Sequence, residues 1–204
     1  LLAPVSACLA PLMNFREPLR PRAWLWLGLL LGLIEAAAAA ELRVMSFNIW
    51  VGGESGKQPL SQTAEVIRAA KADIVGLQET LGSERDGRRN DAGVELAKLL
   101  GWHYFNQGGS PGVLSRFPIV TNTPGKHGVV IRLAEGRDVH FFNVHFNHAP
   151  YQPYQLLNIP YANAPFIKTA DEAVKEARQA RGGEVARLLA DMQAALASGE
   201  PVFL

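Results

Sequence analysis

The sequence predicts an α/β domain in which helices are layered on a mixed β-sheet. Residues 42–50, LRVMSFNIW, alternate in polarity and are rich in β-formers, which is typical of a strand. Residues 62–71 follow a helical period, and the apolar run at 72–80 predicts a buried strand. Several short strand patterns then follow one another. Helices mixed with isolated and successive strands are typical of a layered α/β domain.

Each element in the first part of this domain has a local signal. Residues 51–61, VGGESGKQPLS, predict a glycine-rich turn after the first strand. The helix at 62–71 carries one apolar face. The strand at 72–80 is a continuous apolar run that closes on polar side chains. Gln78 and Glu79 therefore lie at the C-terminal end of a strand that should otherwise be buried.

The middle of the chain is predicted to consist of a loop, a helix and successive strands. Residues 81–91 are charged and contain glycine, which indicates a loop. A helix is expected to start at Ala92 and to end at Gly101. Strand patterns follow at 102–106, 112–117, 128–133 and 138–146.

The last part of the chain is predicted to hold an irregular segment, a helical segment and the start of a strand. Residues 150–165 hold four prolines among tyrosines and asparagines, which predicts an irregular surface segment. Residues 171–197 are helical in pattern, and we expect Gly182 and Gly183 to break this stretch or to join two helices. The apolar run at 201–204 is of the kind that begins a buried strand.

The N-terminal 40 residues have the layout of a secretory signal peptide. Residues 1–12 are interpreted as upstream translation, and residues 13–40 as the signal peptide. Three arginines precede an apolar core of 11 residues and a small-residue site, EAAAAA. Crossing a bilayer needs about 20 residues, so no stable membrane span is expected after cleavage. An uncleaved anchor is the alternative, although Glu35 interrupts it.

The expected mature chain therefore begins at Glu41 and is secreted or periplasmic. The only cysteine, Cys8, lies in the part removed, so the exported domain would carry no thiol and suits an oxidising compartment. Without residues 1–40, the 20 basic and 19 acidic residues fall by three and two, to 17 of each. The mature chain is formally neutral and shows no strong polyanion-binding field. Its 164 residues (204 less 40) suffice for one domain.

Two polar residues at strand ends could carry chemistry. Asn48 precedes the glycine-rich loop, where its amide could face a cleft, but an Asx-turn is the alternative interpretation. Glu79 places a charge at the end of a buried strand, which is costly unless the carboxylate binds a cation or is paired. The alternative is that the strand ends at Gln78 and Glu79 is solvated.

A serine-hydrolase pattern at 108–112, GGSPG, is rejected on mechanism. The residue after the nucleophile must donate a backbone N–H, and Pro111 has none. A strand-like run follows, so a hairpin-type turn is expected.

Three histidines, His140, His145 and His148, lie within nine positions. If 138–146 is one strand, His140 and His145 face opposite sides, because their separation is odd. One zinc ion could not bind both without a bulge. His145 and His148 could converge, so a zinc site remains a minor alternative.

Four motifs, RVMSFNIW, DIVGLQET, GVLSRFPI and FFNVHFNHAPYQPYQ, resemble the endonuclease/exonuclease/phosphatase superfamily in order and spacing. The resemblance, to deoxyribonuclease-I-like proteins, runs from Arg43 to about Gln155. It implies a four-layer sandwich of two mixed β-sheets flanked by helices, incomplete at the C-terminus. It also implies a metal-dependent phosphoester hydrolase, either a phosphodiesterase, such as a nuclease, or a phosphatase.

The resemblance implies roles for three residues. Asn48 and Glu79 would line a metal–phosphate site, with Glu79 as the ligand of Mg²⁺ or Mn²⁺. His145 would bind the scissile phosphate or protonate the leaving oxygen. The segment 114–119, LSRFPI, is expected to be mainly structural, although Ser115 could face the site. The substrate could be nucleic acid, phospholipid or a small phosphodiester, and the protein is expected to be a monomer.

The sequence departs from the family pattern in its later motifs. The G-D-x-N motif and the Asp-His pair that complete the family's site do not occur in it. Residues 41–204 are therefore expected to be the N-terminal part of the domain, inactive alone, with an exposed sheet edge and apolar face. A non-catalytic binding module on the same fold and a zinc-dependent hydrolase that uses the histidines are the alternative functions.

Overall fold

The structure is a computed structural model that describes residues 41–204. The predicted upstream segment and signal peptide, residues 1–40, lie outside the described residues. Within residues 41–204, no helix is both long and apolar enough to cross a bilayer.

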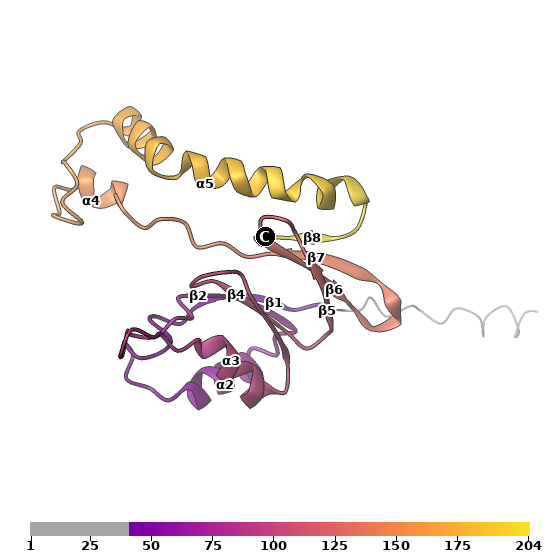
Figure 1. Ribbon diagram of the computed structural model, residues 1–204. Helices are drawn as coiled ribbons and strands as arrows, with labels where there is room; N and C mark the ends of the chain where they lie inside the picture. Colours follow the sequence, from indigo (N-terminus) through magenta and orange to yellow (C-terminus); the bar gives the residue numbers. More distant parts are fainter. Residues whose placement is uncertain (1–40) are drawn as a thin grey trace, which may run out of the picture. The chain divides into compact units, whose positions relative to one another are not determined.

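The first β-sheet has four strands in the order β1-β2-β4-β3. β1 pairs with β2 in parallel, and the other two pairings are antiparallel, so the sheet is mixed (Figure 1). The strands are β1 (Val44–Asn48), β2 (Ile74–Gln78), β3 (His103–Asn106) and β4 (Gly112–Ser115).

The second sheet also has four strands and is also mixed, in the order β5-β6-β7-β8. Only the β7–β8 pairing is parallel. The strands are β5 (Ile119–Asn122), β6 (Gly128–Arg132), β7 (Asp138–Phe142) and β8 (Val202–Phe203). β8 confirms the strand expected in the apolar run at 201–204, whereas β5 was not predicted.

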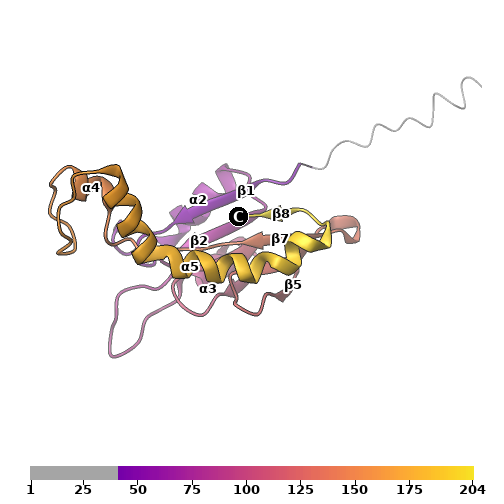
Figure 2. The ribbon, with the colours of Figure 1, turned by 90° about the horizontal axis from the view of Figure 1, so that it is seen from above.

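Helices cover the outer faces of the two sheets, as Figures 1 and 2 show. α2 (Leu60–Ala69) and α3 (Ala92–Leu100) lie against the first sheet, and α5 (Ala170–Ser198) lies against the second. A short helix, α4 (Gln152–Leu156), and a 3₁₀ turn, η1 (Ala134–Gly136), complete the elements. The helices predicted at 62–71 and after Ala92 are confirmed, and α3 ends at Gly101 in the left-handed conformation.

Three apolar layers hold these elements together. The layer under α2 and α3 includes Ile67 and Leu96. The layer between the sheets joins Ile74 of the first sheet to Ile131 of the second. The third layer packs Phe142 of β7 beneath α5. The order helix, sheet, sheet, helix is the predicted four-layer sandwich.

β2 is the buried centre of the first sheet, as its continuous apolar sequence predicts. All five of its residues are buried, with β1 on one side and β4 on the other. Gly76 is required because a Cβ there would lie 2.6 Å from Oδ1 of Asn143, which enters from the second sheet. The absence of a side chain at Gly76 makes room for a polar group between the sheets.

Two predictions about element boundaries are wrong. Residues 138–146 are not one strand, because β7 ends at Phe142 and Asn143 turns its amide into the inter-sheet layer. Residues 170–198 form one continuous helix through Gly182 and Gly183. The cost of a helical glycine is about 1 kcal/mol. A capping box at Thr169 and the packing of the later turns on Phe142 outweigh this cost.

The hairpin-type turn at 108–112 is confirmed. β3 and β4 are antiparallel neighbours joined through residues 107–111. The backbone N–H and Oγ1 of Thr80 both donate to the carbonyl oxygen of Ser110, at 2.7 and 2.8 Å. These bonds hold the turn next to the end of β2, close to Glu79.

Both sheets of the described residues are open and end in terminal strands. β1 and β8 are each terminal strands of their sheets, with one paired neighbour apiece. An apolar groove of about 210 Å³ has Met45, Phe141 and Phe203 among its lining residues. Residues of β1 and β8 are among those that line this groove.

Candidate functional site

Asn48 and Glu79 meet at the carboxyl ends of two neighbouring parallel strands. The register places Asn48 of β1 beside Gln78 of β2, so the next residue of β2, Glu79, lies within reach of the amide. Asn48 Nδ2 donates to Glu79 Oε1 at 2.9 Å. Asn48 Oδ1 accepts from the backbone N–H of Trp50 at 2.9 Å, which is an Asx-turn. The Asx-turn considered for Asn48 is confirmed, and its amide N–H at the same time faces the Glu79 carboxylate.

The glycine-rich loop wraps around Glu79. Its backbone φ is +59°, in the left-handed region, which is uncommon for a residue with a side chain. The backbone N–H of Val51 donates to Glu79 Oε2 at 3.1 Å, and that of Gly52 donates to the Glu79 carbonyl at 2.7 Å. A Cβ at Gly52 would lie 2.8 Å from the backbone nitrogen of Gly82, so only glycine fits there. Glu79 is therefore held in one orientation.

His145 reaches this carboxylate from the second sheet. It follows β7 by three residues, and its Nε2 lies 3.9 Å from Glu79 Oε1. Both side chains keep about a third of their surface exposed, 32% and 29%. The pair is an ion pair whenever the imidazole is protonated. The structure thus brings together the three site residues, Asn48, Glu79 and His145, that the sequence singled out.

A buried network of amides supports the three residues. Asn143 Oδ1 accepts from Gln78 Nε2 at 2.7 Å, and Asn143 Nδ2 donates to Gln107 Oε1 at 2.8 Å and to the Leu77 carbonyl at 2.9 Å. Gln78 precedes Glu79 directly, and Asn143 precedes His145 by two positions. The network therefore connects the backbone that carries Glu79 to the backbone that carries His145.

Comparison with known protein families decides which family this fold belongs to. The model of the endonuclease/exonuclease/phosphatase family matches residues 45–204. The chain belongs to the endonuclease/exonuclease/phosphatase family. This family is one of phosphoester hydrolases that generally depend on a divalent metal ion.

Similarity to individual family members is low. The chain is 26% identical, over 152 residues, to the uncharacterized protein F14F9.5 of Caenorhabditis elegans. The match covers 72% of this chain and 46% of that protein, so the chain spans about half the length of this curated relative.

Two solved structures of the family are also similar to the chain. The endonuclease/exonuclease/phosphatase of Beutenbergia cavernae DSM 12333 is 22% identical, with a TM-score of 0.40, over 58% of this chain and 43% of that one. The family protein of Leptotrichia buccalis C-1013-b is 15% identical, with a TM-score of 0.39, over 68% and 74%.

The donor set at Glu79 fits the hard divalent cation that family enzymes use. Mg²⁺ prefers oxygen ligands, retains several waters and is commonly held by one or two carboxylates together with substrate phosphate. Glu79 supplies one carboxylate at the cleft. Among residues 41–204, no three His, Cys, Asp or Glu side chains gather as a metal cluster. In this arrangement Asn48 turns its N–H toward Glu79, so it orients the carboxylate, and its role as a metal ligand stays a prediction.

The other two histidines of the cluster lie apart from this family site. His140 Nε2 is 2.8 Å from Glu200 Oε2. This contact links β7 to the residues just before β8. The His148 ring makes an edge contact with Tyr161, with ring centroids 5.8 Å apart. The structure does not bring either histidine to Glu79.

The LSRFPI landmark of the family is structural, as expected. Ser115 is fully buried in β4, and its Oγ accepts from the backbone N–H of Phe117 at 3.0 Å. Arg116 Nη1 bonds Asp73 Oδ1 at 2.8 Å, which links the end of β4 to the start of β2. Ser115 therefore does not face the site.

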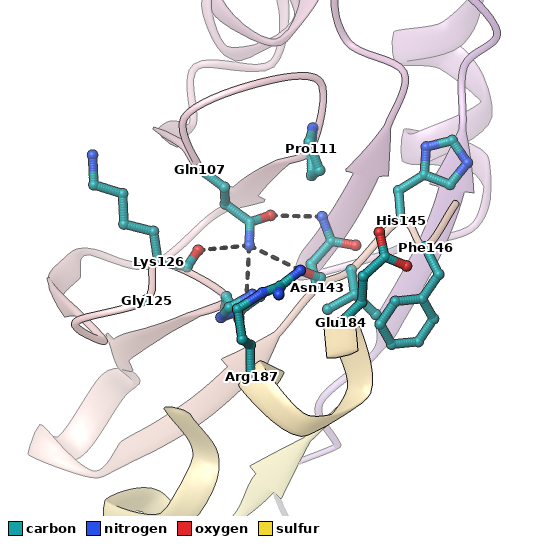
Figure 3. Close-up of a pocket in the computed structure, with 11 residues that line it drawn as sticks. Gln107, Pro111, Gly125, Lys126, Asn143, His145, Phe146, Glu184 and Arg187 are labelled. Carbon is teal, nitrogen blue, oxygen red and sulfur yellow. Dashed lines mark hydrogen bonds between the residues drawn. The ribbon is translucent and has the colours of Figure 1, made fainter. Parts of the chain in front are cut away.

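Sequence reasoning missed several residues around His145. Asn143 and Gln107 form the supporting network, and Lys126, His127 and Arg187 line a pocket that also includes His145 (Figure 3). A polar residue inside the apolar run FFNVHF could have indicated Asn143. Arg187 has no such signal, because charged residues on a helix surface are common.

Proposed function

We propose that this protein is an exported, Mg²⁺- or Mn²⁺-dependent phosphoester hydrolase, either a phosphodiesterase, such as a nuclease, or a phosphatase. One observation carries the proposal. Asn48, Glu79 and His145 come from three separate segments, yet a 2.9 Å hydrogen bond and a 3.9 Å contact join them, and the Glu79 and His145 side chains stay partly exposed. Family membership supplies the reaction class, and these side chains supply groups that the reaction needs.

The geometry suggests a role for each side chain. The cation bound at Glu79 would neutralise charge that develops on the phosphoryl group. Asn48 holds the carboxylate in place through its N–H. His145 Nε2 lies 3.9 Å from Glu79 Oε1, and its imidazolium could donate a hydrogen bond or a proton to an ester oxygen of the substrate. The hydrogen bond from the loop N–H of Val51 holds the Glu79 carboxylate before substrate arrives, which lowers the cost of ordering it.

Variants of the intact protein test the proposal. Glu79→Gln keeps the shape of the side chain but removes the negative charge that holds the cation. His145→Ala removes the proton donor. We expect each change to lower turnover of a generic phosphodiester, bis(p-nitrophenyl) phosphate, by about 10²–10⁴-fold. Activity should also disappear with EDTA and return with Mg²⁺ or Mn²⁺.

The matched control is Glu65→Gln on the exposed face of α2, which should keep full activity. Circular dichroism and the urea midpoint should show that all three variants fold. Undiminished turnover in Glu79→Gln or in His145→Ala would overturn the proposed function. Stoichiometric, tightly held zinc in the purified protein would favour the zinc-dependent alternative.

A further inference from the structure

A second polar pocket lies directly beside His145. It is about 210 Å³ in volume, and Figure 3 shows its lining residues as sticks. Lys126 comes from the turn between β5 and β6, Arg187 and Glu184 come from α5, and His145 follows β7. We call it the Arg187 pocket. Its full lining is Gln107, Pro111, Gly125, Lys126, His127, Asn143, Val144, His145, Phe146, Glu184 and Arg187.

The Arg187 pocket carries an excess of positive charge. Lys126 and Arg187 form no ion pair with any other residue in the described part of the chain. Glu184 is the one acid among the lining residues, and its Oε2 already accepts from the backbone N–H of Asn147 at 3.0 Å. Arg187 lines the pocket without a carboxylate partner within residues 41–204, so an anion there is favoured, whereas the Lys126 side chain points away from Arg187 in Figure 3.

His127 adds a third donor group to this pocket. Its Nδ1 lies 3.0 Å from Asp191 Oδ2, which is 5% exposed. Burial opposes ionisation of Asp191, but hydrogen bonds from Thr123, Gly125 and His127 outweigh it and lower the pKa of this carboxyl. The ionised carboxylate orients the ring. The other ring nitrogen, Nε2, has no hydrogen-bond partner among residues 41–204.

The walls of the pocket are held rigidly. Gln107 Nε2 lies within hydrogen-bonding distance of the backbone carbonyls of Lys126, His127 and Asn143, at 2.8, 3.0 and 2.9 Å. Asp191 fixes the same turn from α5 by accepting from the backbone N–H of Gly125 at 2.8 Å. Because the turn and the helix are already tied together, the cationic side chains start from fixed anchor points, and a bound anion need order only their ends.

We propose that the Arg187 pocket binds a second phosphate group of the substrate, next to the phosphate that is hydrolysed. This inference rests on the proposed function, because His145 lines the pocket and also lies 3.9 Å from Glu79. Arginine binds phosphate through two parallel hydrogen bonds, and lysine and imidazolium add charge. His145 would lie between the two phosphates.

The substrate class that fits best is a small molecule with two phosphate groups. Pockets that enclose a whole drug-sized ligand measure about 300–1,000 Å³, so one of about 210 Å³ suits a substituent of the substrate. The 17 basic and 17 acidic residues of 41–204 cancel, which does not favour a long polyanion. A nucleic-acid strand is the competing source of a second phosphate, and the experiment separates the two.

The test measures binding in EDTA, where hydrolysis does not interfere. Calorimetry compares fructose 1,6-bisphosphate with fructose 6-phosphate, two probes that differ in one phosphate. We expect the protein to prefer the bisphosphate by about tenfold or more, the effect of a charge-assisted hydrogen bond. Arg187→Gln should remove most of that preference. Arg178→Gln, an exposed arginine on the same helix outside the pocket, should keep it.

The outcomes separate the two proposals. Equal affinity for the two probes, or a preference unchanged in Arg187→Gln, would overturn the second-phosphate pocket. The second-phosphate pocket would also be overturned if Arg187→Gln lowered the affinity for a short single-stranded oligonucleotide but left the affinity for the bisphosphate unchanged. The preference should survive in Glu79→Gln, because the pocket does not depend on the metal. If Glu79→Gln keeps full turnover and still prefers the bisphosphate, the proposed hydrolase function is overturned and the second-phosphate pocket stands.

Discussion

Asn143 shows how one buried residue organises the site. Its amide is 5% exposed and satisfies partners from both sheets, including Gln78, Gln107 and the carbonyls of Leu77 and Gly112. A buried polar group is costly when it is unpaired and stabilising when every partner is met. Since Gln78 and Asn143 flank Glu79 and His145 in the chain, the same bonds that satisfy the amide also set the distance between the site residues.

Asn143→Ala is expected to destabilise the fold by about 1–3 kcal/mol, because Gln78 and Gln107 lose a buried partner. The free energy of unfolding from urea titration measures this loss. Activity of the folded variant should also fall, since Glu79 and His145 lose their shared anchor. The control is Asn122→Ala, an exposed asparagine whose Nδ2 donates to the Thr123 carbonyl at 2.8 Å. An equal, small loss of unfolding free energy in both variants would show that the Asn143 network does not stabilise the fold.

The elements could be predicted unevenly from the sequence. β2 and α3 were identified because a continuous apolar run and a helical period closed by glycine are local signals. α5 was predicted to break at Gly182 and Gly183, since glycine is a poor helix former. The helix continues because its later turns pack Leu188 and Met192 on the second sheet, and this packing is invisible in the local pattern.

A pair of glycine substitutions tests the continuity of α5. Gly182 has helical backbone and no atom within 4 Å of an added Cβ, so Gly182→Ala should stabilise the protein by about 0.4–1 kcal/mol. Gly101 has equally open space but a φ of +71°, so Gly101→Ala should destabilise it by a similar amount or more. Thermal unfolding of the two variants measures both effects. A destabilising Gly182→Ala would mean that the helix is broken there in solution.

The whole molecule combines the sandwich with an N-terminal segment outside the described residues. Export was inferred from residues 13–40 alone, so it stands as a proposal. A neutral mature chain without cysteine is compatible with it.

The export proposal makes a simple prediction. In cells, the exported protein should begin at Glu41, which N-terminal sequencing can show. Ala38→Leu together with Ala40→Leu should block cleavage and leave a longer chain, because signal peptidase needs small residues at the site. Ala36→Leu, which is further from the site, should still be cleaved. A protein that keeps residues 13–40 when the alanines are intact would favour the uncleaved anchor.

The sequence by itself determined the layered α/β class and most of the strands and helices, and its resemblance to the family predicted Asn48, Glu79 and His145 as site residues. The elements are local features, because alternation and helical period can each be read within about ten residues. Only the tertiary structure decided that the three side chains meet, that Asn143 ties them together, and that Arg187 of α5 lies beside His145. These contacts join residues 31 or more positions apart. Such distances depend on strand register and on how the layers pack, and local polarity does not specify either.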